Sequence, residues 1–152
     1  MARSALLLLL LLSACRRRSE PAEQKTAVAA GKLSEASLAT RDGRKRRYYV
    51  YRPKGYSAST PPPVVLVLHG GGGNALGAQT STFTHAAADR HGYFPVYPEG
   101  VSKPVLGKPM ATWNGGYCCG LAKQENVNDV AFLSELLDRL ATQHPYDRAR
   151  VH

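Results

Sequence analysis

The sequence predicts an α/β domain, with a mostly parallel sheet flanked by helices and an antiparallel hairpin at its N-terminal end. Val64–Leu68 is an unbroken apolar run, rich in β-branched residues, that leads into several glycines. Such a run is typical of a strand buried on both faces. Strand-like and helix-like stretches alternate after it, which favours a parallel sheet covered by helices. Asp42-Gly43, between two strand-like stretches, is a strong hairpin signal.

Residues 1–14 have the pattern of an export signal. Arg3 supplies a positive start, and Leu6–Leu12 is an apolar stretch far shorter than the ~20 residues that span a bilayer. Leu12-Ser13-Ala14-Cys15 resembles a bacterial lipobox, which implies cleavage before Cys15 and lipidation of its sulfur. Several acyl chains would hold Cys15 to a membrane. We therefore expect an extracytoplasmic bacterial protein, either membrane-anchored or, if the signal is an ordinary one, secreted.

Residues 15–34 contain few large apolar side chains, so we expect a flexible tether before a folded domain at 35–152. The formal net charge is +9, and part of it lies in the runs Arg16–Arg18 and Arg44–Arg47. Such runs attract anionic lipid or acidic polymers. We expect the second run to be a solvated hairpin edge. No helix-turn-helix, zinc or RNA-binding pattern accompanies the charge, so we expect no nucleic-acid partner.

The first half of the folded domain divides into a hairpin and a strand–helix–strand unit. Tyr-rich and β-branched residues predict strands, and His91-Gly92 is typical of a helix end. Pro95 predicts either a bulge in the last strand or the start of that strand. The expected elements are a strand at Ser37–Thr40, a turn at Arg41–Arg44, strands at Lys45–Arg52 and Val64–Leu68, a helix at Leu76–Arg90 and a strand at Tyr93–Tyr97.

The second half begins with a long loop, Val101 to Val127, and loops of this length commonly form lids or binding sites. Asn128-Asp129 predicts a helix cap. The helix over 130–141 then carries an apolar stripe of Val130, Leu133, Leu137 and Leu140. Residues 148–152 are typical of the start of another strand.

Two adjacent cysteines, Cys118 and Cys119, lie in the long loop. An ordinary disulfide between neighbours is strained, so pairing with each other and pairing with another partner both remain open. Outside the cytoplasm we expect them to staple a loop rather than to act as a redox pair. No Cys/His spacing suits a metal, and we expect no cofactor.

Gly70–Gly73 directly follow the apolar strand. Glycines allow a sharp turn that aims backbone N–H groups at a developing negative charge, which is the layout of an oxyanion-hole loop. Gly71 and Gly72 are the candidate donors, and a merely tight strand-to-helix turn is the alternative. We expect His69 to organise this loop as a hydrogen-bonded polar residue rather than to serve as the general base.

Several segments together resemble one family, the extracellular polyhydroxybutyrate depolymerases and feruloyl esterases of the α/β-hydrolase group. The resemblance covers residues 38–152 and implies a serine esterase that cleaves a polyester or a feruloylated polysaccharide through an acyl-enzyme, without metal or cofactor. The segments that carry it are Arg47–Tyr56, Leu68–Ala75, Tyr97–Gly100, Trp113–Gly120 and Asn128–Leu133.

The chain departs from that family because it contains no Gly-x-Ser-x-Gly nucleophile elbow. The resemblance implies that the serine, the acid and the base would follow His152. We therefore expect a domain truncated before the nucleophile elbow, inactive and poorly soluble alone. Trp113 and Asn114 could line a substrate pocket, with loop packing as the alternative. A non-catalytic surface lipoprotein that binds a partner or glycan is the rival function, and a peptidase of the same fold is a third.

Overall fold

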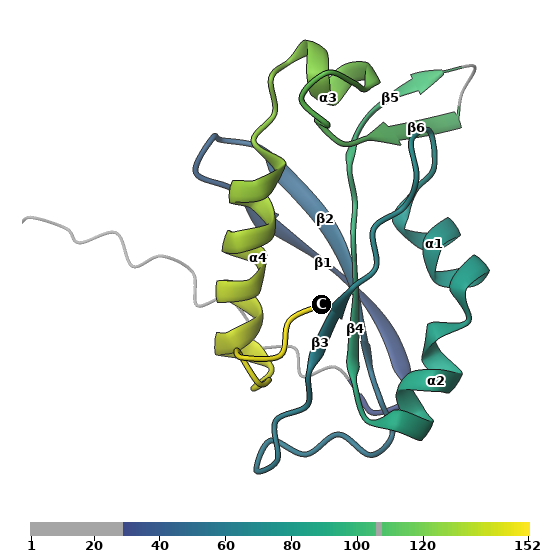
Figure 1. The fold of residues 1–152 in the computed structure, drawn as a ribbon, viewed down its shortest axis with the longest axis vertical. Helices are drawn as coiled ribbons and strands as arrows, with labels where there is room; N and C mark the ends of the chain where they lie inside the picture. Colours follow the sequence, from purple (N-terminus) through teal and green to yellow (C-terminus); the bar gives the residue numbers. More distant parts are fainter. Residues whose placement is uncertain (1–28, 106–107) are drawn as a thin grey trace, which may run out of the picture.

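The structure is a computed structural model that describes residues 29–105 and 108–152. The expected export signal, the lipidation site Cys15 and most of the expected tether lie outside the described residues. In the described part a four-stranded sheet carries helices on both faces, and a separate two-stranded hairpin lies at one end (Figure 1). No helix within 29–105 or 108–152 combines the length and the apolar character that crossing a membrane requires.

The N-terminal hairpin forms as predicted. Strand β1 (Lys32–Ala39) pairs antiparallel with β2 (Lys45–Arg52), and Ala39 lies opposite Lys45. Gly43 adopts a φ of 82° in the turn, a conformation that favours glycine. Strand β1 begins at Lys32, earlier than the expected domain start at residue 35, because its first residues pair with the end of β2.

The sheet has the strand order β1-β2-β4-β3, so β4 (Phe94–Pro98) lies between β2 and β3 (Val64–Leu66). Strand β4 is antiparallel to β2 and parallel to β3. All five residues of β4 are buried, as expected for a central strand. Pro95 is tolerated because it pairs only with β3, and the β2 ladder starts one residue later, at Val96.

The single helix expected over Leu76–Arg90 is wrong: two helices form, α1 (Ala75–Thr82) and α2 (Thr84–His91). They meet at Phe83, which has a left-handed φ of 52°. Tertiary contacts fix the break, because Tyr93 donates its hydroxyl to the carbonyl of Thr84 and Tyr97 hydrogen-bonds the Thr84 side chain. Both helices cover one face of the sheet (Figure 1).

Helix α4 (Asp129–Gln143) covers the opposite face, and Asn128 caps it by accepting the N–H of Ala131. The expected apolar stripe is partly wrong. Val130 is 76 % exposed, and the buried stripe runs through Phe132, Leu136 and Leu140. Leu133 and Leu137 pack at its margin, against the core that the sheet and α4 share.

The long loop expected between residues 101 and 127 contains three elements instead. Strands β5 (Val101–Val105) and β6 (Lys108–Thr112) form an antiparallel hairpin, and α3 (Gly120–Gln124) follows. Prolines 104 and 109 argue against strands in the sequence. They are compatible with this hairpin because it is only two-stranded, so a residue without an N–H can face away from the partner strand.

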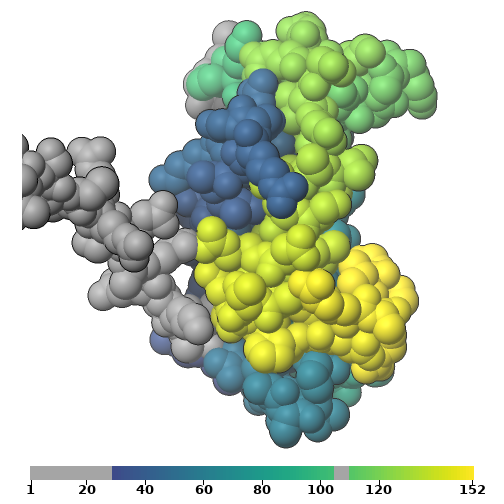
Figure 2. All heavy atoms as spheres, turned by 90° about the vertical axis from the view of Figure 1, so that its left-hand side faces the viewer, coloured from purple at the N-terminus to yellow at the C-terminus, as the bar shows by residue number. Residues whose placement is uncertain are grey.

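Residues 150–152 lie beside β3 as a short parallel bridge at Val151, where a further strand was expected. The N–H of Val64 donates to the carbonyl of Arg150 at 3.0 Å, and that of Leu66 donates to His152 at 2.7 Å. Figure 2 shows the yellow C-terminal segment on the surface, next to the segment that leads into β3.

Candidate functional site

The glycine loop, residues 68–74, connects the carboxyl end of β3 to α1. Its far end is fixed by Asn74, whose side chain accepts the N–H of Gly77 at 2.7 Å and so caps the helix. Ligands in open α/β sheets bind at the carboxyl ends of the strands. The loop therefore lies at the edge of the sheet where a site is expected.

The backbone N–H groups of the loop differ in what they bind. Gly73 donates to the carbonyl of Gly70 at 3.0 Å, and Gly72 donates to the carbonyl of Ala111 at 2.8 Å. Gly71 is exposed, and its N–H donates to no residue within 29–105 or 108–152. Of the two candidate oxyanion donors, Gly71 thus has an unengaged N–H, whereas that of Gly72 holds the loop in place.

His69 is buried beneath the loop, with 5 % of its surface exposed. Its Nδ1 lies 2.8 Å from the carbonyl of Gly70, and its Nε2 lies 3.0 Å from the N–H of Gly100. A carbonyl can only accept and an N–H can only donate, so the proton is on Nδ1 and Nε2 accepts. With both ring nitrogens engaged, His69 organises the loop, as its place in the sequence predicts.

Glu99 lies at the end of β4 and binds the start of α1. Both of its carboxylate oxygens lie 3.3 Å from the N–H of Ala75, where the positive end of the helix dipole stabilises a negative charge. One oxygen is also 3.4 Å from His69 Nε2. Glu99 therefore contacts both the start of α1 and the imidazole beneath the glycine loop.

Trp113 braces the glycine loop, whereas Asn114 binds the segment that leads into α4. The indole N–H of Trp113 donates to the carbonyl of His69 at 2.9 Å, and the two rings are 5.0 Å apart. Asn114 donates its backbone N–H to Asp129 at 2.7 Å and its side-chain amide to the carbonyl of Val127. The structure therefore engages both in loop packing. Asn114 also lines a cavity of about 310 Å³ together with Gly116 and residues 126–130.

Arg46 is not at a solvated edge, which corrects the expectation for the second basic run. Its side chain is 4 % exposed, lies 2.8 Å from the carboxylate of Asp129 and rests over the ring of Phe132 at 4.0 Å. It also donates to the backbone carbonyl of Glu99. Strand alternation was the signal that could have found it, because Arg46 shares a face of β2 with the buried residues Tyr48 and Val50.

Cys118 and Cys119 form a disulfide with each other, and each is half-buried in the segment between β6 and α3. The carbonyl of Cys118 accepts the N–H of Gly115 at 2.6 Å, which closes a tight turn. Within residues 29–105 and 108–152, no group of three or more His, Cys, Asp and Glu side chains could hold a metal ion.

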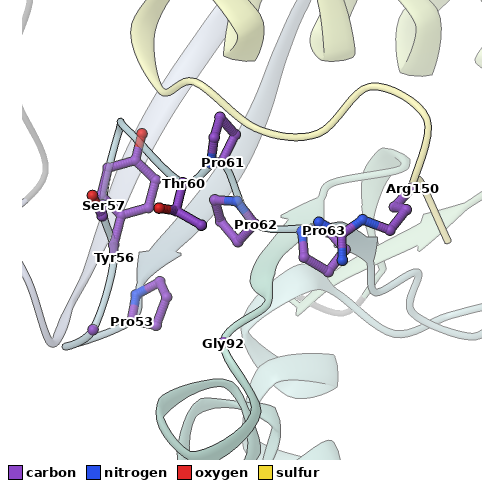
Figure 3. A pocket seen from close by; sticks show the side chains of 10 residues that line it. Pro53, Tyr56, Ser57, Thr60, Pro61, Pro62, Pro63, Gly92 and Arg150 are labelled. Carbon is purple, nitrogen blue, oxygen red and sulfur yellow. The ribbon is translucent and has the colours of Figure 1, made fainter.

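A cavity of about 410 Å³ lies at the other end of the sheet (Figure 3). Its walls come from segments that lead into the strands, including Pro61–Pro63 before β3, Gly92 before β4 and Arg150. Figure 3 shows proline rings and the Tyr56 ring around it, with Arg150 on one side. Since it borders the amino ends of the parallel strands, it is separate from the glycine loop.

No family model and no curated protein sequence matches the chain. Solved structures do match it. An S-formylglutathione hydrolase from Agrobacterium tumefaciens has a TM-score of 0.59 at 18% identity, over 82% of this chain. The poly(3-hydroxybutyrate) depolymerase LpqC from Bordetella parapertussis has a TM-score of 0.56 at 23% identity, over 81%. A ferulic acid esterase has a TM-score of 0.55 at 22% identity, over 79%.

The match covers only part of each of these proteins: 48% of the S-formylglutathione hydrolase, 42% of the depolymerase and 48% of the ferulic acid esterase. The chain thus spans less than half the length of each. Their shared architecture confirms the α/β-hydrolase fold class that the sequence predicts. The described sheet is mixed rather than mostly parallel, because β2 is antiparallel to both of its neighbours.

Proposed function

We propose that this chain, which has the α/β-hydrolase fold, is the N-terminal part of a serine esterase that hydrolyses carboxylic esters. The proposed substrates are polyesters of the polyhydroxybutyrate type or feruloylated polysaccharides. Two of the structural neighbours are named for these activities. Because these neighbours are only 22–23% identical to the chain, they support its fold alone. The proposed substrate class rests on the sequence motifs that resemble the family.

The observation that carries the proposal is the exposed, unengaged N–H of Gly71 at the carboxyl end of β3. In acyl transfer the carbonyl oxygen becomes negatively charged, and backbone N–H groups held in advance at that position stabilise the charge. The loop is held by His69, Ala111 and Trp113, so the donor does not have to reorganise during the reaction.

The proposal assigns the nucleophile to residues beyond His152. Residues 150–152 run parallel to β3 and are hydrogen-bonded to it. A serine elbow that followed a strand at this position would come to the same sheet edge as Gly71, since the carboxyl ends of parallel strands share an edge. The N–H after that serine would be the second oxyanion donor. Residues 1–152 without it are proposed to be inactive.

We also propose export and lipid anchoring through Cys15, on the sequence pattern alone. Radiolabelled palmitate supplied to cells that express the protein tests this proposal. Incorporation that Cys15→Ala abolishes supports the anchor. Equal labelling, or none, in the two proteins contradicts it.

Reading the gene beyond the codon for His152 is the first test of the esterase. An in-frame continuation through Gly-x-Ser-x-Gly, then Asp and His, supports the proposal. A stop codon there contradicts it and leaves the non-catalytic lipoprotein as the better function.

The second test uses the full-length gene product and p-nitrophenyl butyrate. Gly71→Pro removes the N–H and is expected to lower kcat about 10²- to 10³-fold, the usual loss for one oxyanion donor. Gly71→Ala keeps the N–H, and its added Cβ meets nothing within 4 Å, so it should lose far less. Circular dichroism checks that both variants fold. Equal activity of the two variants contradicts the role of Gly71.

A further inference from the structure

The β5–β6 hairpin is joined to the glycine loop by backbone hydrogen bonds. The N–H of Gly72 donates to the carbonyl of Ala111 at 2.8 Å, and the N–H of Ala111 donates to the carbonyl of Gly73 at 3.0 Å. This reciprocal pair fixes β6 along the loop that carries Gly71. In Figure 1 the hairpin lies at the end of the molecule above α1. The glycine loop leads into the first residue of that helix.

Met110 precedes Ala111 in β6, and neighbouring side chains in a strand point to opposite faces. Ala111 is fully buried, whereas Met110 is 44 % exposed. The Met110 methyl carbon lies 3.2 Å from where a Cβ on Gly72 would stand. Its side chain therefore rests on the glycine loop, one residue away from the unengaged N–H of Gly71.

Two other exposed apolar residues lie at the ends of the same loop. Leu68 lies at its start and Leu76 in the first turn of α1, and both are exposed. An unengaged N–H at Gly71 next to the apolar side chain of Met110 suits a ligand that has one polar oxygen and an otherwise apolar body. The thioether of Met110 is flexible and polarisable, which suits contact with a flexible alkyl group.

We propose that Met110 is a specificity-determining residue that packs against the acyl group of the ester. This inference rests on the proposed esterase function. With the carbonyl oxygen bound at Gly71, the first carbons of the acyl chain lie within reach of the side chain that covers Gly72. Short apolar acyl groups, of the size of a butyryl or hydroxybutyryl unit, are the preferred class, and charged acyl groups are disfavoured.

The geometry also accounts for glycine at position 72. Its φ of +78° is a conformation that favours glycine, and a Cβ there would push against the Met110 methyl group. A larger residue would displace Met110 from the loop.

The test measures kcat/KM of the full-length gene product for p-nitrophenyl acetate and p-nitrophenyl butyrate. Met110→Ala removes the contact, and Met110→Gln keeps its length but makes it polar. Both are expected to lower the butyrate-to-acetate ratio about three- to tenfold, the size expected from lost contact with one or two methylene groups. Phe83→Ala, at an exposed apolar residue between α1 and α2, is the matched control and should leave the ratio unchanged.

An unchanged ratio in both Met110 variants, with hydrolysis intact, overturns this inference and leaves the esterase function standing. A ratio that falls equally in Phe83→Ala also overturns it, because the effect would not be specific to the loop. A parent protein that hydrolyses neither ester overturns both proposals. Circular dichroism spectra that match the parent are required of each variant.

Discussion

The indole N–H of Trp113 donates a hydrogen bond to the carbonyl oxygen of His69, 2.9 Å away and 44 residues earlier in the chain. The bond ties the segment after β6 to the base of the glycine loop. The two rings also contact each other in a tilted arrangement, with an interplanar angle of 33°. The position of the candidate oxyanion donor thus depends on a residue far from it in sequence.

Replacing Trp113 with phenylalanine keeps a ring but removes the donor. The carbonyl of His69 then loses its partner, and we expect the free energy of unfolding to fall by about 1 to 2 kcal/mol. Urea denaturation of the purified protein measures the change. Tyr117→Ala, at a residue 95 % exposed in the same segment, should change it by less than about 0.5 kcal/mol. Equal effects would show that the bond to His69 is unimportant.

Removing one partner of the buried ion pair Arg46–Asp129 should lower the free energy of unfolding strongly. Replacing both partners should lower it less than the two single changes together. Asp129→Ala leaves the arginine charge without its partner, and we expect a loss of about 3 to 5 kcal/mol. The double variant Arg46→Met with Asp129→Ala should lose less than the two single variants added together. The exposed pair Arg148 and Asp138 is the control, with an expected loss of at most about 1 kcal/mol. Additive losses at the buried pair would contradict this account.

Gly100 has no room for a side chain. A Cβ there would stand 2.6 Å from the carbonyl oxygen of Thr112 and 3.0 Å from His69 Nε2. We expect Gly100→Ala to lower the midpoint of urea denaturation, with a cost of about 1 to 3 kcal/mol. Gly55→Ala meets nothing within 4 Å and should not be destabilising. A Gly100→Ala protein as stable as Gly55→Ala would mean that the approach of β4 to the loop is looser than described.

Acidification below about pH 6.5 should weaken the fold through His144. Burial lowers the pKa of this imidazole below its ordinary value of 6.5, and the nearby Arg52 lowers it further. The unfolded chain therefore binds a proton at a higher pH than the folded protein does. The resulting stabilisation is complete above pH 6.5 and is lost as the pH falls toward the lower, folded pKa.

His144→Gln removes this contribution, so the stability of the variant should fall less between pH 7 and pH 5 than that of the parent. Urea denaturation at both pH values measures it. Burial also lowers the pKa of His85, which gives the same sign, so some pH dependence should remain in the variant. An identical fall in both proteins would contradict the role of His144.

Local patterns were enough to predict the hairpin and the glycine loop. Asp42-Gly43 specifies its turn through backbone preferences alone, and the run before His69 specifies a strand followed by a turn. The strand is shorter and less buried than expected, because it ends at Leu66 and only Val64 in it is fully buried, while Leu68 is exposed. Each signal lies within a few residues of the turn or strand that it predicts, so contacts with distant residues did not alter the type of these elements.

The remaining features depend on distant contacts. Phe83 interrupts a helix-compatible stretch because Tyr93 and Tyr97 hold the start of α2. Arg46 is buried because Asp129, 83 residues away, neutralises it. The β5–β6 hairpin contains prolines that local propensity counts against a strand, and the hydrogen bonds of Ala111 to the glycine loop cannot be read from neighbouring residues.

The strand order has a consequence for synthesis on the ribosome. Strands β2 and β3 are consecutive in the chain but are separated in the sheet by β4, so neither can complete its pairing until residues 94–98 have left the exit tunnel. Pairing over such separations is slow and leaves strand edges open in the meantime. The nascent chain must therefore wait with unpaired strand edges, a state that favours contact with chaperones.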